Sequence, residues 1–376
     1  MNMSERLAVV VRPDIAPGQR VLAISDIHGN LPFLRGVLDK ARFTPEDVLV
    51  LVGDLIEKGE DSLGVLRYVM QLQRTHKVYP LCGNCDRWTV LFLRGEEGTE
   101  DKLLPYFQFR RARALAIQMG RELGLDVPET KEDMVRLRQA LWEHMPRECQ
   151  FLLDMPQVLE AGNFIFAHGG VMRDENLDTL PADGCMGWDN FLGEGLSFRK
   201  WVVVGHWPVT LYNPRVPTAR PLILPQRHIA SIDGGCVLKV DGQLNALIIP
   251  DVYGEALDYV AYDGLPVVVA EEDQAPSQDS INIRWSDRTV EILREEGDGC
   301  WCRHVSSGRE VWILREYLYF QKDGTVHCED STDYLLPVTA GERLSLVRRC
   351  SRGILAKKDG VTGWYRGKFR EITDDK

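Results

Sequence analysis

Six side chains in five short segments of the 376-residue chain have the residue types and spacing of metal ligands. They are Asp26, His28, Asp54, Asn84, His168 and His206. Carboxylate and amide oxygens combined with imidazole nitrogens suit Mn²⁺, Fe and Zn²⁺. Two such cations about 3.5–4 Å apart bind phosphoryl oxygens and generate hydroxide at neutral pH. The residues therefore predict a dinuclear centre whose bridging hydroxide attacks a phosphoester in line.

One carboxylate must be shared by the two metals, and Asp54 is the expected bridge. Asp26 and His28 are predicted to complete the first metal site. The second site is predicted to use the three ligands that follow later in the chain, Asn84, His168 and His206. Because an amide is a neutral donor, Asn84 keeps the charge of the site low enough for an anionic substrate to approach. Manganese is the expected metal, with Fe or Zn²⁺ as alternatives.

Each ligand segment follows a short apolar run that predicts a buried strand. These runs cover residues 21–24, 48–52, 78–81, 164–167 and 202–204. Open α/β sheets bind their ligands where strands end and loops begin. One Asp-x-His or Gly-His pair alone would be weak evidence. Five such segments, each at a strand end, favour a single site.

The elements around these segments predict an α/β fold. Helical patterns at 31–41 and 61–75 alternate with the first strands, which indicates a largely parallel sheet with right-handed crossovers. Residues 88–150 carry apolar residues at helical spacing and predict an inserted helical segment beside the site. The runs 229–232, 236–240 and 244–249 predict closing antiparallel strands, the last two joined by a tight turn at Asp241-Gly242.

The C-terminal part has a different composition. Residues 266–280 are acidic and polar, which predicts a linker after a first domain at 1–265. Beyond it, short strand-like runs separated by Gly and Asp turns predict small barrels. Two copies of one unit are expected, at about 281–325 and 332–376.

Over roughly residues 20–250 the chain resembles the calcineurin-like metallophosphoesterases. The resemblance rests on the order of five motifs: D-x-H, G-D, G-N-C-D, H-G-G and G-H. The segments 53–59 and 232–235 resemble the bacterial phosphoprotein phosphatase branch in particular. The resemblance implies an α/β (α+β) sandwich, two divalent metals and hydrolysis of a phosphorylated protein or a small phosphoester. The two C-terminal copies resemble bacterial SH3-like modules, which implies a peptide or protein partner.

Several positions around the ligands bear on the activity that the resemblance implies. Glu57 and Lys58 match an acidic residue and a phosphate-binding basic residue of the phosphatases, although lysine offers a point charge instead of a bidentate fork. Cys85 stands where those phosphatases have the histidine that protonates the leaving group, and a thiol is a poor substitute. Asp86 could act as the acid if its pKa is raised. The G-N-C-D form itself resembles small prokaryotic phosphodiesterases of the superfamily.

Three functions therefore stay open. The leading prediction is a serine/threonine phosphoprotein phosphatase, with catalytic roles for Asp54, Asp86, Glu57, Lys58 and Cys85. The alternative is a dinucleoside polyphosphate hydrolase or phosphodiesterase. A catalytically weak metal-binding scaffold that recruits partners is the alternative of another class.

Composition limits the partners and the compartment. The net charge of −11 disfavours nucleic acid, which is bound through clustered Lys and Arg. The sequence contains no run of the roughly 20 apolar residues needed to cross a bilayer. The N-terminus predicts no signal peptide, and the nine cysteines are expected to be free thiols. A cytoplasmic protein is expected.

Overall fold

The computed structural model describes residues 6–96 and 98–372, which divide into two compact units. The first unit runs to Trp207 and includes Pro221–Val237 and Leu244–Tyr262. The second unit comprises the other segments, Pro208–Arg220, Leu238–Gln243 and the chain from Asp263 onward. Residues 208–220, 238–243 and 263–265 of the predicted 1–265 domain thus belong to the second unit, and the boundary at 265 stays a prediction.

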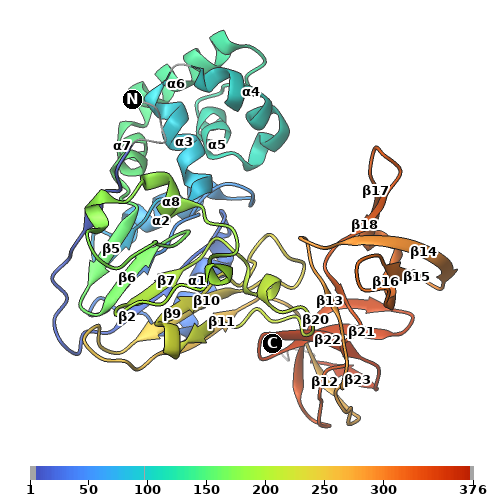
Figure 1. Cartoon of the computed structure of the whole chain (residues 1–376). Helices are drawn as coiled ribbons and strands as arrows, with labels where there is room; N and C mark the ends of the chain where they lie inside the picture. Colours follow the sequence, from blue (N-terminus) through green and yellow to red (C-terminus); the bar gives the residue numbers. More distant parts are fainter. Residues whose placement is uncertain (1–5, 97, 373–376) are drawn as a thin grey trace. The chain divides into compact units, whose positions relative to one another are not determined.

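The first unit is built on two sheets (Figure 1). One sheet has six strands in the order β1 (Val10–Val11), β5 (Val158–Ala161), β6 (Phe164–Ala167), β7 (Trp201–Val204), β9 (Ile229–Ser231), β8 (Leu222–Leu224). The other has five strands in the order β11 (Asp258–Tyr262), β10 (Leu244–Ile249), β2 (Val21–Ile24), β3 (Val48–Leu51), β4 (Lys77–Pro80). The strands expected before the five ligand segments are all present.

Side-chain alternation along the strands produces two apolar layers. Val21 and Ala23 of β2 pack with Phe164 and Phe166 of the other sheet, in a core between the sheets. Leu22 and Ile24 point the other way, into a core shared with the helices. β2 and β3 are therefore buried on both faces, which explains why their sequences are continuously apolar.

Helices cover the outer face of the five-stranded sheet and form a separate helical segment. The crossover helices between β2, β3 and β4 are α1 (Leu31–Lys40) and α2 (Ser62–Leu72). The helical segment contains α3 (Asn84–Arg94), α4 (Thr99–Arg110), η2 (Arg111–Arg113), α5 (Leu115–Glu122), α6 (Lys131–His144) and α7 (Pro146–Asp154). Shorter elements of the first unit are η3 (Leu177–Thr179), α8 (Ala182–Met186), η4 (Phe191–Glu194) and η6 (Pro225–Arg227). Within the described residues no helix is both long and apolar enough to span a bilayer.

The prediction of three consecutive closing antiparallel strands is wrong. β9 runs parallel to β7 in the six-stranded sheet, whereas β10 is antiparallel to β2 in the other sheet. Residues 236–240 form turns instead of a strand. Two polar side chains in and beside that segment contact residues far along the chain. Asp241 accepts a hydrogen bond from Thr362, and Lys239 pairs with Asp330 at 2.6 Å.

The second unit consists of short strands in several sheets (Figure 1). One sheet has the order β22 (Val361–Tyr365), β21 (Gly353–Lys358), β20 (Arg343–Cys350), β12 (Val267–Ala270), β23 (Phe369–Glu371). A second has the order β16 (Glu310–Leu314), β15 (Gly299–His304), β14 (Thr289–Glu296), β18 (Val326–Cys328), β17 (Leu318–Phe320). The remaining elements are β13 (Asn282–Ile283), β19 (Ser331–Thr332), η5 (Val209–Tyr212) and η7 (Arg315–Tyr317).

Two features of this unit bear on the predicted organisation. The segment 266–280, which is predicted to be a linker, contains the strand β12. The apolar residues of β12 pair with β20. The two larger sheets contain similar three-strand meanders, β14-β15-β16 and β20-β21-β22. The first pairing of each meander has a register shift at the same place, between Ile292 and Arg294 and between Leu346 and Arg348. This match supports an internal repeat.

Candidate metal centre

The parallel strands of each sheet place the ligand loops at common edges. β2, β3 and β4 run parallel, as do β6 and β7, so their carboxyl ends lie together. The loop after β2 carries Asp26 and His28, the loop after β3 carries Asp54, and Asn84 starts α3 directly after the β4 loop. His168 and His206 follow β6 and β7. The structure brings all six predicted ligands into one cluster.

His28 faces two carboxylates. Its Nε2 atom lies 3.7 Å from Oδ1 of Asp26 and 3.7 Å from Oδ2 of Asp54. The His28 side chain is completely buried, and neither ring nitrogen has a hydrogen-bond partner among the described residues. Burial, reinforced by the positive charge of Lys58, lowers the pKa of His28 to about 3, so the imidazole is neutral. A neutral, buried and unpartnered imidazole between carboxylates is suited to a cation.

A second group of donors surrounds the side-chain oxygen of Asn84. Oδ1 of Asn84 lies 3.0 Å from Nε2 of His168 and 2.8 Å from Nδ1 of His206. Nε2 of His168 is also 3.3 Å from Oδ1 of Asp54. Asp54 therefore presents one oxygen to each group, as a bridging ligand would.

The two later histidines are held in orientation by contacts outside this cluster. Nδ1 of His168 donates to the carbonyl of Val52 at 2.8 Å, which turns Nε2 toward the site. Nε2 of His206 lies 3.1 Å from Oδ1 of the exposed Asp189, which leaves Nδ1 facing Asn84. Such partners fix which nitrogen is available to a metal.

Negative charge accumulates in this buried site. Burial, together with the charge of Asp54, raises the pKa of Asp26 to about 6. Burial lowers the pKa of His168, but the charges of Asp54 and Asp26 outweigh it and raise that pKa to about 10. Asp233 is buried as well, and burial together with the charge of Asp26 raises its pKa. The clustered carboxylate, amide and imidazole donors fit two divalent cations.

The ligand loops contain an unusual number of left-handed backbone conformations. Positive φ values occur at Asp26 (56°), His28 (50°), Asp54 (52°), Glu57 (71°), Lys58 (67°) and His206 (66°). Each such non-glycine residue costs on the order of 1–3 kcal/mol and persists only when its surroundings impose it. The sandwich thus holds these side chains in a strained arrangement.

Glycines precede ligands where the loops approach most closely. A Cβ atom at Gly83 would lie 2.2 Å from Oδ1 of Asp54, and one at Gly205 would lie 2.3 Å from Oδ2 of Asp26. A side chain at either position would displace a carboxylate of the site. The glycines in the G-N and G-H segments are therefore explained by close packing against the ligands.

Asp86 is turned into the loop that follows Asp54. Its Oδ1 accepts the backbone N–H groups of Leu55 (3.0 Å) and Ile56 (3.2 Å), and its Oδ2 accepts that of Gly83 (2.8 Å). Burial raises the pKa of Asp86 to about 7. All three contacts use its oxygens as acceptors, so the carboxylate braces the loop against the start of α3.

Glu57 and Lys58 have different surroundings. Glu57 is fully buried and accepts hydrogen bonds from Thr89 (3.0 Å), the backbone of Leu115 (3.0 Å) and the hydroxyl of Tyr106 (2.8 Å). It ties the ligand loop to the helical segment. Lys58 interacts with residues of the metal cluster. Burial alone would lower the pKa of Lys58, but Cys85 and the nearby aspartates have the larger effect, so the pKa is raised. Its side chain stays cationic.

Sequence reasoning missed an aromatic pair beside the site. Trp88 lies one helical turn after Asn84 on α3, and its ring stacks on that of Tyr106 at 6.0 Å. Trp88 is 38% exposed, although it is large and apolar. The four-residue spacing from Asn84 was the available signal. The contact with Tyr106 could not be deduced, because it depends on the fold of the helical segment.

Comparison with known proteins identifies a family and several relatives. Residues 19–228 match the model of the calcineurin-like phosphoesterase family. The chain is 37% identical over 109 residues to the symmetrical bis(5′-nucleosyl)-tetraphosphatase of Edwardsiella ictaluri, covering 28% of this chain and 38% of that protein. It is 35% identical over 112 residues to the enzyme of the same name from Salmonella arizonae, covering 29% of this chain and 39% of that protein. The chain thus matches less than two thirds of the length of these relatives.

Two solved structures match part of the chain with TM-scores below 0.5. A putative diadenosine tetraphosphatase has 21% identity and a TM-score of 0.43, covering 68% of this chain and 100% of that chain. A serine/threonine phosphatase from Saccharomyces cerevisiae has 10% identity and a TM-score of 0.40, covering 70% of this chain and 86% of that chain. Because the matching family model spans more than half of the chain, the protein belongs to the calcineurin-like phosphoesterase family and is a phosphoesterase of a kind that uses divalent metal ions.

Proposed function

We propose that the protein hydrolyses phosphoanhydride bonds in dinucleoside polyphosphates. The observation that carries this proposal is the absence of a suitable proton donor at the two positions after Asn84. Cys85 replaces the expected histidine, and burial together with the charge of Asp54 raises the pKa of its thiol. Asp86, the other candidate acid, has a pKa raised to about 7, but both of its oxygens are engaged by backbone N–H groups of the neighbouring loop.

The leaving group decides how much this matters. A serine or threonine alkoxide must be protonated as it leaves, and general acid help is typically worth about 10²–10⁴-fold in rate. A nucleoside diphosphate leaves as a stable anion without a proton. The site is therefore better matched to an anhydride or an activated ester than to a phosphoprotein, which reverses the order of the two enzymatic predictions made from the sequence.

The remaining residues have defined tasks in this proposal. Two bound divalent cations would supply Lewis acidity and activate a water molecule. Asp26, His28 and Asp54 would hold one cation. The other would be held by Asp54 with the three later ligands, Asn84, His168 and His206. Lys58 would attract the negative phosphate chain into the site.

The aromatic pair supports a nucleotide substrate. Trp88 is about 6 Å along the helix axis from Asn84, given a rise of 1.5 Å per residue. Helical side chains lean toward the N-terminus of their helix, which brings its ring toward the ligand loops. Stacking of a base on an aromatic ring is worth about 1–3 kcal/mol. The names of the relatives in Edwardsiella and Salmonella point to the same substrate class.

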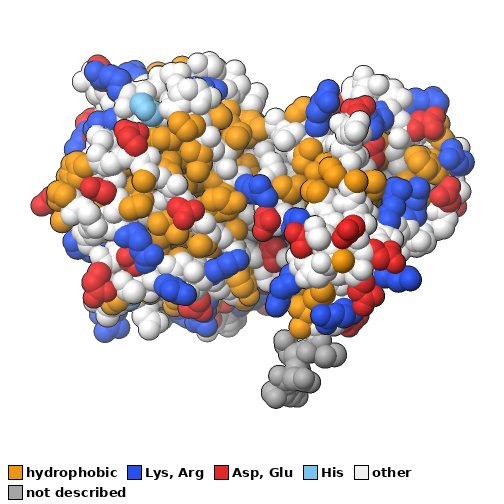
Figure 2. All heavy atoms as spheres, turned by 90° about the horizontal axis from the view of Figure 1, so that it is seen from below, with side chains coloured by type: hydrophobic (Ala, Val, Ile, Leu, Met, Phe, Trp, Pro, Cys, Tyr) orange, Lys and Arg blue, Asp and Glu red, His pale blue; other side chains and the backbone are white. Residues whose placement is uncertain are grey.

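The net charge of −11 supports a small substrate rather than a nucleic acid. Figure 2 shows acidic and basic side chains interspersed over the face it presents. A nucleic-acid backbone is bound through clustered Lys and Arg.

The experiment that tests the proposal compares three substrates on the metal-loaded protein: diadenosine tetraphosphate, a phosphoserine peptide and a bis-aryl phosphate. Two ADP molecules per diadenosine tetraphosphate are expected, at the highest kcat/KM of the three. Preference for the phosphopeptide would favour the phosphatase, to which Lys58 and the 53–59 segment are also suited. Turnover of any of them would exclude a scaffold without activity.

We further propose that the two C-terminal repeats are SH3-like modules that bind a cytoplasmic peptide or protein. The equivalent register shifts of the two meanders support the repeat. Trp312 and Trp364 pack edge to face at 5.6 Å in the core of this unit. Trp301 is only partly buried and is the better candidate for a partner contact. Loss of binding in Trp301→Ala during pull-down with a defined partner would support this role, and unchanged binding would contradict it.

A further inference from the structure

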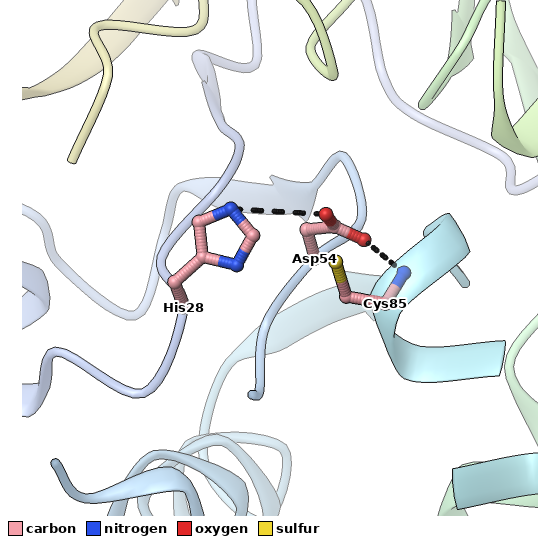
Figure 3. Close-up of side chains that lie close together, drawn as sticks. All are labelled: His28, Asp54 and Cys85. Atoms are coloured by element: carbon pink, nitrogen blue, oxygen red, sulfur yellow. Dashed lines mark hydrogen bonds and ion pairs between the residues drawn. The ribbon is translucent and has the colours of Figure 1, made fainter. Parts of the chain in front are cut away.

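Cys85 lies beside residues of the first predicted metal site. The ligand atoms of His28, Asp54 and Cys85 all lie within 4.8 Å of one another, and all three side chains are buried. Figure 3 shows them converging from three separate segments, with the Cys85 sulfur beside the Asp54 carboxylate. With metal–ligand bonds of roughly 2.0–2.3 Å, two ligands of one ion lie no more than about 4.6 Å apart, so these three side chains are close to the spacing of a coordination site.

The cluster has a second feature that points to a missing cation. His28 is completely buried, yet neither of its ring nitrogens has a hydrogen-bond partner within the described part of the chain. A buried imidazole without a partner is costly unless something binds it. Its Nε2 atom faces Asp54 at 3.7 Å, on the side where the sulfur of Cys85 also lies.

The sulfur of Cys85 lies beside two hydrogen-bond donors. Its backbone N–H donates to Oδ1 of Asp54 at 2.8 Å, which fixes the residue against the bridging carboxylate. Nδ2 of Asn84 approaches the sulfur at 3.6 Å, while the oxygen of the same amide faces the second site. The Lys58 side chain also bonds to the sulfur. Hydrogen bonds to a coordinated sulfur tune a metal site.

We propose that Cys85 is a ligand of the first metal, together with Asp26, His28 and Asp54, and that its sulfur makes this site select zinc over manganese. Soft thiolate ligands favour zinc, whereas manganese prefers oxygen donors. Binding replaces the S–H bond with a sulfur–metal bond and releases one proton to solvent, with no change of oxidation state. This assigns a role to the residue that replaces the expected histidine, and it changes the expected metal at one site from manganese to zinc.

Cobalt substitution tests the proposal without any substrate. Cobalt-loaded protein should show a thiolate-to-cobalt charge-transfer band in the near ultraviolet, and Cys85→Ser should lose it. Cys82→Ser is the matched control, because Cys82 is a buried free thiol in the same loop and lies outside the cluster. The band should survive in that variant. A cobalt-loaded parent without the band, or a band that persists in Cys85→Ser, would overturn the proposal.

X-ray absorption of the zinc-loaded parent provides a second test that does not depend on how a variant folds. One sulfur at about 2.3 Å from zinc is expected, whereas only nitrogen and oxygen neighbours would contradict the assignment. Dialysis against equal zinc and manganese should load one zinc per parent chain, with a preference that falls about tenfold or more in Cys85→Ser. These readouts are independent of the substrate. The zinc assignment can therefore fail while the proposed hydrolysis stands, and the proposed hydrolysis can fail while the zinc assignment stands.

Discussion

Oδ1 of Asp54 lies 3.3 Å from Nε2 of His168, while the other oxygen of the same carboxylate faces His28 at 3.7 Å. One side chain at the end of β3 thus contacts donors from both sheets of the first unit. The arrangement explains why a metal centre depends on both sheets, and it places Asp54 between the two groups of donors.

Asp54→Asn should reduce phosphoesterase activity to background and lower the metal content at both sites, because the variant removes the shared charge. Metal analysis after gel filtration and turnover of an aryl phosphate measure the two effects. Asp178→Asn is a suitable control, since Asp178 is an exposed partner of Arg12 away from the ligands. Parent-like metal content in Asp54→Asn would contradict the bridging role.

Lys58→Gln should lower kcat/KM by about 10²-fold or more, because a preorganised positive charge beside the phosphate is lost. Lys58→Arg keeps the charge and should retain a larger part of the activity. Steady-state kinetics at fixed metal occupancy separate this effect from metal loss. Equal damage in both variants would indicate a packing role instead.

Trp88→Ala should raise KM for diadenosine tetraphosphate by about tenfold, which corresponds to the loss of one stacked base. The kinetics with a small aryl phosphate should stay unchanged, because that substrate has no base. Phe109→Ala is the matched control: Phe109 is 78% exposed on α4 and lies near Arg110. A similar loss with both substrates would argue against base stacking by Trp88.

Thr130→Ala should reduce the free energy of unfolding by about 1 kcal/mol at neutral pH, because Thr130 caps helix α6. Its Oγ1 accepts the N–H of Asp133 at 3.1 Å, and Oδ2 of Asp133 accepts the N–H of Thr130 at 2.9 Å. Bonds from Thr130 lower the pKa of Asp133 to about 2.

This depressed pKa sets the pH dependence of the cap. The contribution of Asp133 is present above the usual aspartate pKa of about 3.9 and is lost as the pH falls through about 2. Urea unfolding of the parent, Thr130→Ala and Thr130→Ser at pH 7 and pH 3 measures it. Thr130→Ser should remain close to the parent, and equal stability of all three proteins at pH 7 would refute the capping role.

The metal ligands could be predicted from the sequence because local signals specify them. Asp26, Asp54 and His168 each follow a continuous apolar strand within a few residues. The contact between Tyr106 and Glu57 could not be predicted, because the two residues are brought together by the packing of the helical segment.

The error at residues 236–240 has a related cause. The pattern of Val237, Leu238 and Val240 resembles a strand, but these side chains are partly exposed, and Val237 has a φ of 66°. The hydrogen-bond partner of the adjacent Asp241 is Thr362, which lies 121 residues further along the chain. Local alternation carries no information about so distant a partner.

Cleavage of the phosphate chain of a dinucleoside polyphosphate is tested most directly by the ratio of kcat/KM for diadenosine tetraphosphate to that for a phosphoserine peptide, with products separated by chromatography. ADP is the expected product, and a ratio of at least about 10² is expected, because general acid help to an alkoxide leaving group is typically worth this much. Faster release of phosphate from the peptide, with diadenosine tetraphosphate left intact, would contradict it.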